Sequence, residues 1–237
     1  MSSISFVYFD AVGTLMRPEP SPAAIYAEIG ARFGLALPIE TVGARFRRAF
    51  RRQEQFDGRD GRWATSPERE RDRWRRIVHE VFTGGDDDAP AGEPTPETEA
   101  AFVALWDHFA RPDAWAMYED AVQAIRALDA RGRPWGIASN FDARLRSVVA
   151  GRPELRGCRV VVTSAEVGYR KPGAGFFRAA EALAGVSGSQ LLLVGDDEEN
   201  DRAGGSAAGW QTRLINRAAG DRIDAALADE SFDGATR

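Results

Sequence analysis

The chain has 237 residues, of which 43% are hydrophobic and 28% are charged, so it can bury one full core and form a modest second domain. Its formal net charge of -5 at pH 7 argues against nucleic acid as a partner, because binding to a phosphate backbone needs concentrated positive charge. It has no apolar run near the ~20 residues that span a bilayer and no signal-peptide pattern at its start, and its single cysteine, Cys158, excludes an intrachain disulfide and a multi-cysteine metal site. We therefore expect a cytoplasmic protein with neither nucleic acid nor a membrane as its partner, while nothing in the sequence indicates an oligomeric state.

The first predicted element is a buried strand over residues 4–9, which are mostly apolar or aromatic. The strand ends at Asp10, and the chain then turns through Gly13 and Thr14. A carboxylate is thereby placed at the tip of a strand.

Apolar residues at helical spacing predict four helices in the next part of the chain, over residues 21–34, 39–56, 66–82 and 98–109. The first and third begin with a serine followed by a proline, at Ser21 and Ser66, which is typical of a helix start. The segment 84–96 is rich in Gly, Pro and Asp and is predicted to be a loop.

In the second half of the chain, helices and strands alternate. The predicted helices cover 120–131, 141–150 and 173–184, and the predicted strands cover 133–139, 158–164, 190–196 and 209–216. Because such alternation is typical of parallel sheets, we expect an α/β fold with a doubly wound parallel sheet. The core domain is then formed by 1–18 and 116–237, and the helical block 19–115 is an inserted cap domain.

Polar side chains follow the ends of the predicted strands in four places. Asp10 follows the first strand, Ser139 and Asn140 end the second, Lys171 lies beyond the third, and the acidic run 195–201 ends the fourth. Ligands of doubly wound sheets bind at the carboxyl ends of the strands, so we expect these side chains to meet in one site.

These four motifs, FDAVGTL, IASN, RKP and VGDDEEND, resemble those of the haloacid dehalogenase (HAD) superfamily of hydrolases. The resemblance covers nearly the whole chain and implies a Rossmann-like core with a C1-type helical cap between the first and second motifs. The form DAVGTL, with SAEVGYRKP and GDDEEND, is most similar to the REG-2-like branch of that superfamily. The resemblance implies a hydrolase, and a phosphatase is the activity that we expect first.

The resemblance also implies that Asp10 is the nucleophile and forms an aspartyl-phosphate with a small phosphorylated metabolite. A Mg²⁺ ion between nucleophile and phosphate would cancel their repulsion and polarise the phosphate. The implied ligands are the Asp10 carboxylate, the main-chain carbonyl of Val12 and the Asp196 carboxylate, with Asp201 ordering the outer shell. Hard oxygen atoms of this kind are the ligands that Mg²⁺ prefers.

The remaining implied roles concern the phosphate. Lys171 would neutralise the nucleophile and the phosphate, which favours an ionised Asp10. Ser139 and the backbone amide of Asn140 would donate hydrogen bonds to phosphoryl oxygens. Thr14 would hold the loop after the first strand and belongs to the expected substrate-binding residues.

The sequence departs from the superfamily's phosphatases at Val12. In those enzymes the residue two places after the nucleophile is an aspartate that protonates the leaving group and then activates water. Valine can do neither, and acid/base help is worth about 10²–10⁴-fold. Hydrolysis of alkyl phosphates should therefore be slow unless another group, such as Glu68 of the cap, replaces the aspartate or the substrate has a good leaving group, as acyl and aryl phosphates do.

Carbon–halogen cleavage by Asp10 is the first alternative, because haloacid dehalogenases also lack that aspartate. Those enzymes do not use magnesium, and their fourth motif lacks the paired carboxylates found here at Asp196 and Asp201. A carboxylate substrate could be bound by the arginine-rich cap, although a solvated helix face is the more common role of such residues, which here are Arg47, Arg48, Arg51 and Arg52.

A second alternative is a protein that binds a phosphorylated ligand without converting it. Asp10, Lys171 and Asp196 would then form a binding site, and exposed tryptophans of the cap, Trp63 and Trp74, would form an interaction surface. Packing within the cap is the more common role of such tryptophans.

Overall fold

The computed structural model describes residues 3–59, 61–84 and 92–228. Residues 85–91, most of the predicted loop 84–96, lie outside these ranges. Within the described part of the chain, no helix combines the length and the apolar character that crossing a membrane would require.

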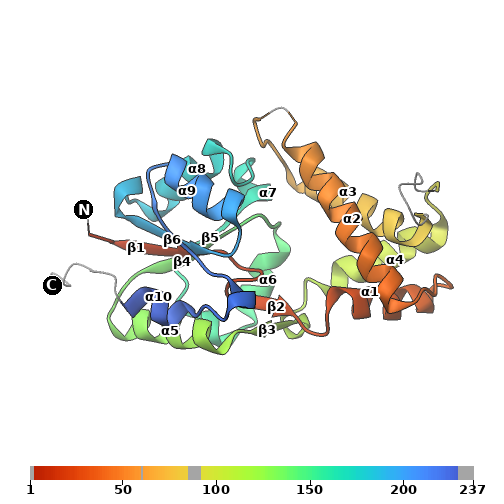
Figure 1. Cartoon of the computed structure of the whole chain (residues 1–237), viewed down its shortest axis with the longest axis horizontal. Helices are drawn as coiled ribbons and strands as arrows, with labels where there is room; N and C mark the ends of the chain where they lie inside the picture. The colour runs from red at the N-terminus through yellow and green to blue at the C-terminus, as the bar shows by residue number, and fades with distance from the viewer. Residues whose placement is uncertain (1–2, 60, 85–91, 229–237) are drawn as a thin grey trace.

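The core of the molecule is a parallel sheet with the strand order β5-β4-β1-β6-β7. Figure 1 shows this sheet with helices on both of its faces. The first strand in the chain, β1, lies at the centre between β4 and β6, as expected for a doubly wound fold. The five strands are β1 (Phe6–Phe9), β4 (Trp135–Ser139), β5 (Val161–Thr163), β6 (Leu191–Gly195) and β7 (Gln211–Leu214).

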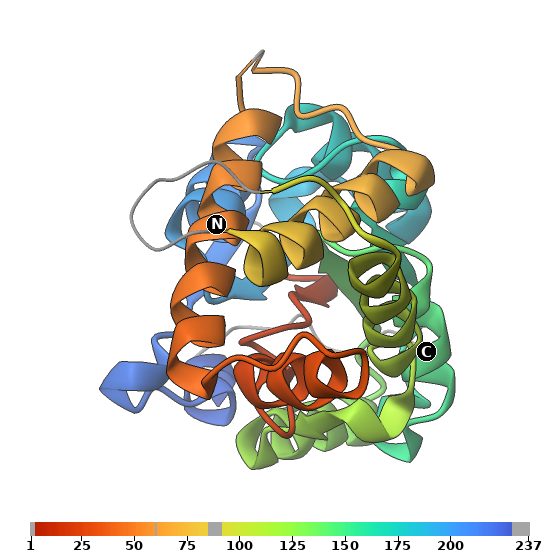
Figure 2. The same ribbon diagram turned by 90° about the vertical axis from the view of Figure 1, so that its right-hand side faces the viewer.

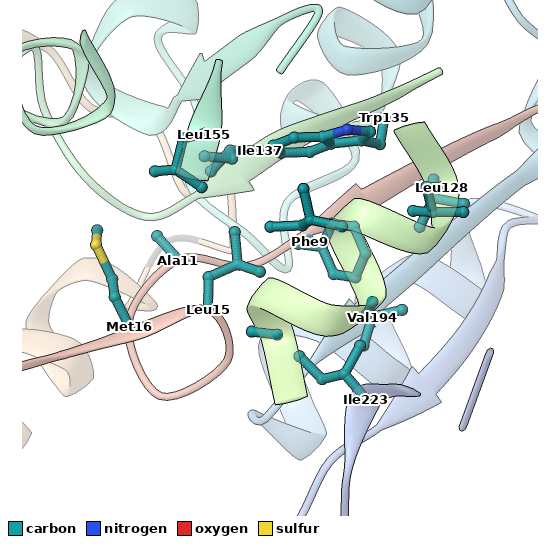
Figure 3. Close-up of a cluster of buried hydrophobic side chains, with 14 of the residues drawn as sticks. Phe9, Ala11, Leu15, Met16, Leu128, Trp135, Ile137, Leu155, Val194 and Ile223 are labelled. Atoms are coloured by element: carbon teal, nitrogen blue, oxygen red, sulfur yellow. The ribbon is translucent and has the colours of Figure 1, made fainter. Parts of the chain in front are cut away.

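Alternating side chains of the central strands contribute to two separate hydrophobic clusters. Val7 and Phe9 of β1 point into one cluster, whereas Phe6 and Tyr8 point into the other. The first cluster also holds Trp135 and is drawn in Figure 3. It is covered by α5 (Glu119–Ala130), α6 (Arg144–Ala150) and α10 (Ile223–Ala228), and the second by α8 (Ala174–Ala184). Both faces of the central strands β1 and β6 are therefore buried, which explains why these strands are almost wholly apolar.

Four helices form a separate layer beside the carboxyl edge of the sheet, and we call them the helical cap. They are α1 (Pro22–Arg32), α2 (Ile39–Asp57), α3 (Pro67–Thr83) and α4 (Pro96–His108). The side chains of Ser21, Ser66 and Thr95 each accept a hydrogen bond from a backbone amide at the start of a helix, and a proline follows each of them. The four helices share one hydrophobic cluster of their own, and Figure 2 shows them in front of the sheet.

Two short strands connect the helical cap to the core. Strand β2 (Met16–Pro18) pairs antiparallel with β3 (Trp115–Met117), so the chain leaves and re-enters the core at the same place. A second contact is made farther away, where Ala64 of the α2–α3 connection forms a β-bridge with Tyr169 of the core. The helical cap is thus attached to the core on two sides.

The predicted fold class is confirmed, and the predicted long helices and strands are found close to their expected ranges. The sequence did not predict β2, β3 or the short helices after β5 and β6, which are α7 (Ser164–Val167), a π-helical turn (Glu198–Ala203) and α9 (Gly204–Ala207). Elements of three to six residues are too short to show a hydrophobic period. The predicted division of the chain at residues 18 and 116 stays a prediction.

Candidate active site

The candidate site lies at the carboxyl ends of the three central strands. Asp10 directly follows β1, Ser139 is the last residue of β4, and Asp196 directly follows β6. Because β4, β1 and β6 are hydrogen-bonded neighbours that run in parallel, their ends bring these three side chains to the same edge of the sheet. The sheet order therefore joins residues that are far apart in the sequence.

Lys171 is the charged centre of the site. Its Nζ donates hydrogen bonds to Asp10 Oδ1 (2.8 Å), Asp201 Oδ1 (2.5 Å) and the main-chain oxygen of Ala138 (2.9 Å). The Lys171 side chain is only 2% exposed and that of Asp201 only 3%. A buried ammonium needs such partners, since an unpaired charge away from water is strongly unfavourable.

The ammonium of Lys171 and the carboxylates beside it shift each other's pKa values. Burial raises the pKa of Asp10 above its ordinary value, while the Lys171 ammonium and a hydrogen bond from Ser139 oppose this rise. Burial alone would lower the pKa of Lys171, but the carboxylates of Asp10 and Asp201 outweigh it and hold that pKa above its ordinary value. Lys171 therefore stays protonated at neutral pH beside the carboxylate that it neutralises.

Three carboxylates form a group that could hold a divalent cation. One oxygen each of Asp10, Asp196 and Asp201 lie within 4.8 Å of one another, and an all-oxygen donor set suits Mg²⁺. Both oxygens of Asp201 also accept hydrogen bonds, from Lys171 Nζ and from the Asp197 amide (3.1 Å), which fits the predicted outer-shell role. The residues present thus fit the ion that the motifs imply.

The loop after β1 is shaped around Asp196. Gly13 has a φ of +90°, and a Cβ built on it would lie 2.2 Å from Asp196 Oδ2, so a side chain is excluded there. Thr14 is fully buried, and its Oγ1 donates a hydrogen bond to Asp196 Oδ1 (3.0 Å). Thr14 therefore positions Asp196. The sequence led us to expect that Thr14 contacts the substrate, but Thr14 does not line the cavity described below.

Asn140 has a role that the motif alone did not reveal. Its side-chain oxygen accepts a hydrogen bond from the Lys171 amide (2.8 Å), and its side-chain nitrogen donates one to the Lys171 carbonyl (3.0 Å). This reciprocal pair fixes the backbone from which the lysine side chain extends. Donation from the Asn140 amide to a phosphate stays a prediction.

Arg217 supports the same loop from the other side and was not identified from the sequence. It donates hydrogen bonds to the main-chain oxygens of Thr14 (2.6 Å) and Gly13 (3.4 Å) and pairs with the Asp120 carboxylate (2.6 Å). No motif surrounds Arg217, so no sequence signal could have found it.

A cavity of about 380 Å³ lies between the site and the helical cap. Asp10, Val12, Ser139, Lys171 and Asp196 are on its wall. Most of the large side chains facing them are aromatic, namely Tyr26, Phe46, Phe50, Trp74, Phe109, Trp115 and Phe141. None of these rings was assigned to the site from the sequence, because aromatic spacing on a helix does not distinguish a core from a cavity wall.

The only cap carboxylate on this cavity, among the residues that the structure describes, is Glu54 of α2. Burial raises the pKa of Glu54, and the nearby Arg73 and Arg170 charges oppose this rise. Glu68, which the sequence offered as one candidate to replace the missing acid, is exposed in the first turn of α3 and does not line the cavity.

The other cap residues singled out in the sequence are placed as follows. Trp63 and Trp74 are half-buried, so they do not form an exposed interaction surface. The four arginines Arg47, Arg48, Arg51 and Arg52 do not line the aromatic cavity; Arg51 lines a second, adjoining cavity of about 480 Å³.

Buried ion pairs close the helical cap onto the core beside Lys171. Arg170 donates to Glu70 of α3 (2.5 Å) and lies 3.7 Å from Asp57 of α2, and all three side chains are at most 4% exposed. The Arg170 amide also donates to the main-chain oxygen of Trp63 (2.8 Å). The cap is therefore held by the residue that immediately precedes Lys171.

A family model described as haloacid dehalogenase-like hydrolase matches residues 4–209. The chain belongs to this family. Haloacid dehalogenase-like hydrolase domain-containing protein 3 of Bos taurus is 29% identical to it, over 93% of this chain and 84% of the relative. Rhythmically expressed gene 2 protein of Drosophila melanogaster is 23% identical, over 91% and 84%. The resemblance stated from the four motifs is thus confirmed.

Solved structures of HAD hydrolases share the fold. A HAD phosphatase from Thermococcus onnurineus aligns with a TM-score of 0.60 and 20% identity, covering 99% of this chain and 91% of that one. An L-2-haloacid dehalogenase from Xanthobacter autotrophicus aligns with a TM-score of 0.64 and 20% identity, covering 90% and 78%. At these identities the two structures support the architecture and do not decide between the two activities.

Proposed function

We propose that this HAD hydrolase is a magnesium-dependent phosphatase that hydrolyses a phosphate ester or acyl phosphate of a small metabolite in the cytoplasm. The observation that carries the proposal is the contact of Lys171 with Asp10 and Asp201, beside a third carboxylate at Asp196. This arrangement combines a buried nucleophile, a fixed cation and an oxygen-rich cation site, which are the parts that phosphoryl transfer needs.

The chain's own residues supply the steps of the reaction. Asp10 attacks phosphorus with one carboxylate oxygen, and the bond from phosphorus to the leaving oxygen breaks, which gives an aspartyl-phosphate. Lys171 neutralises charge at the carboxylate, and Ser139 and the Asn140 amide donate to the phosphoryl oxygens. Mg²⁺, held by Asp10, the Val12 carbonyl and Asp196, would supply Lewis-acid polarisation. Water then releases inorganic phosphate and restores Asp10.

Dehalogenation is the second candidate, and the observation that favours it is Val12 on the cavity wall. A halide leaves without a proton, so a site without the second aspartate suits that reaction. Three carboxylates within 4.8 Å of one another are not needed for it, and we therefore rank it second.

The two candidates are separated by one experiment. The purified protein is assayed with acetyl phosphate and p-nitrophenyl phosphate, with and without Mg²⁺, and with 2-chloropropionate for chloride release. We expect magnesium-dependent phosphate release that is abolished in Asp10→Asn. Chloride release without metal, together with no phosphate release, would refute the phosphatase and support the dehalogenase. Binding of acetyl phosphate with no release of product at all would support a binding protein.

A further inference from the structure

The part of the cavity opposite the nucleophile is a rigid aromatic wall. Phe50 of α2 stands between Phe46 and Trp74, with ring centroids 6.1 Å from each, and Phe46 makes an edge contact with Tyr26 at 5.2 Å. Rings that pack on one another in this way keep their positions, so apolar ring surface borders the cavity. The Arg73 guanidinium lies over the Phe50 ring, 4.8 Å from its centroid, and covers part of that surface.

The positive charges on this wall are already engaged by carboxylates. Arg144 binds both oxygens of Asp142, at 2.9 and 2.8 Å, and Arg73 donates from Nε to Asp57 (2.9 Å). A second phosphate would therefore find few free cationic partners here. Arg73, which lines the cavity, has its Nη2 atom buried without a hydrogen bond, so this atom has the capacity to donate to an acceptor on a ligand.

The size of the cavity agrees with a ligand that carries a ring. An apolar cavity of ~150 Å³ is enough to bind benzene, and this cavity measures about 380 Å³. It therefore has room for one ring beside the phosphoryl group at Asp10.

Val12 adds an independent requirement on the leaving group. Val12 lines the cavity beside Asp10 and can give no proton, which favours a departing oxygen that is stable as an anion. Carboxylates and acidic phenolates meet this requirement, whereas alkoxides do not.

We propose that the substrate is an aromatic phosphate with an acidic leaving group, an aroyl or aryl phosphate whose ring packs against Phe50 and Trp74. The inference rests on the proposed phosphatase function. Asp10 forms the new O–P bond while the old O–P bond breaks, its electron pair leaving on the arenecarboxylate or phenolate with no proton. Water then attacks the aspartyl-phosphate and gives inorganic phosphate, and its proton is taken up by solvent.

Benzoyl phosphate and acetyl phosphate form the test pair, because both release a carboxylate and they differ by the ring. Burial of a ring in a pocket predicts a kcat/KM about 10- to 100-fold higher for benzoyl phosphate. Equal values, with turnover that depends on Asp10, would overturn this inference and leave the proposed function intact. Turnover of neither compound with Mg²⁺ would overturn the proposed function itself.

Two variants of helix α2 test whether Phe50 causes the preference for benzoyl phosphate. Phe50→Leu keeps an apolar side chain but removes the ring, and we expect it to lower the benzoyl-to-acetyl ratio about fivefold or more. Phe56→Leu is the matched control, because Phe56 lies on the same helix, is 45% exposed and does not line the cavity. Since the ratio is measured on one preparation, a partly unfolded variant does not distort it. An unchanged ratio in Phe50→Leu would refute packing of the substrate's ring against Phe50.

A binding measurement tests the aromatic wall without turnover. Phenylphosphonate and methylphosphonate cannot be hydrolysed at the P–C bond, and their affinities in the presence of Mg²⁺ can be compared by calorimetry. We expect phenylphosphonate to bind about tenfold or more tightly. Equal affinities would refute the aromatic wall as a binding surface.

Discussion

Substitution of Val12 by aspartate tests the main chemical departure of this chain. Val12 is half-buried, lies on the cavity wall and follows Asp10 on the same loop. Valine and aspartate have similar volumes, so the loop can keep its shape, and the main cost is the partial burial of a carboxylate, about 1–3 kcal/mol. A carboxyl group at this position would border the cavity beside Asp10. We therefore expect Val12→Asp to fold and to gain an acid/base.

The size of the gain depends on which step the new carboxyl assists. For an alkyl phosphate such as glycerol 3-phosphate it would assist both steps and raise kcat about 10²–10⁴-fold, or about 3–5 kcal/mol of activation free energy. For p-nitrophenyl phosphate, whose leaving group needs no proton, it would speed only hydrolysis of the aspartyl-phosphate. In the unsubstituted protein this second step should limit the rate, so the first turnover should release a burst of p-nitrophenol.

Stopped-flow kinetics measure that burst, and Val12→Asn is the matched control, because asparagine has the shape of aspartate and no acid. We expect a burst close to one p-nitrophenol for each active site in the unsubstituted protein and in Val12→Asn, and its loss in Val12→Asp. If Val12→Asp and Val12→Asn had equal kcat values toward glycerol 3-phosphate, the absent carboxyl would not limit the enzyme. The reasoning would then be refuted.

Three further predictions concern the charged groups. In the unsubstituted protein Mg²⁺ should raise the melting temperature, because a ligand that binds only the folded state stabilises that state. The Asp196→Asn variant should lose most of this increase in melting temperature. An unchanged increase would exclude Asp196 as a Mg²⁺ ligand. Lys171→Met should abolish turnover and lower the unfolding free energy by about 3–5 kcal/mol, because it leaves buried carboxylates unpaired; denaturation that matches the unsubstituted protein would contradict this. Arg170→Met should lower the unfolding free energy by a similar amount. In a double-mutant cycle, adding Glu70→Leu should recover much of this lost stability. Additive losses of stability would show that the two residues do not act as a pair.

The parts of the site that the sequence predicted are those placed by the sheet itself. Asp10, Ser139 and Asp196 could be assigned to one edge because each ends or follows a strand, and parallel strands bring their ends together. Lys171 was assigned to the same site by its motif. The contact of the Asn140 side chain with the Lys171 backbone was not predicted, because a motif gives a residue's position and not the direction of its side chain.

The cap side of the site could not be predicted in the same way. Glu54 and Glu68 are both acidic residues of cap helices, and only the packing of α2 and α3 on the core decides which one faces the cavity. The pairing of Arg170 with Glu70 joins residues one hundred positions apart, and no local pattern reports it. Sequence periodicity identifies the apolar face of a helix, but it does not say whether that face meets another helix or a substrate.

Two features of this chain bear on the group that leaves. The site keeps the proposed nucleophile Asp10, the buried lysine and the carboxylate group, with Gly13 and Thr14 shaped around Asp196. An acid is absent at Val12, beside Asp10, and aromatic rings of the cap line the cavity. An aromatic group attached through an acidic oxygen accounts for both features at once, because the ring fills the apolar space and the oxygen departs without a proton. An alkyl phosphate would account for neither, and a halide would leave the cluster of carboxylates unexplained.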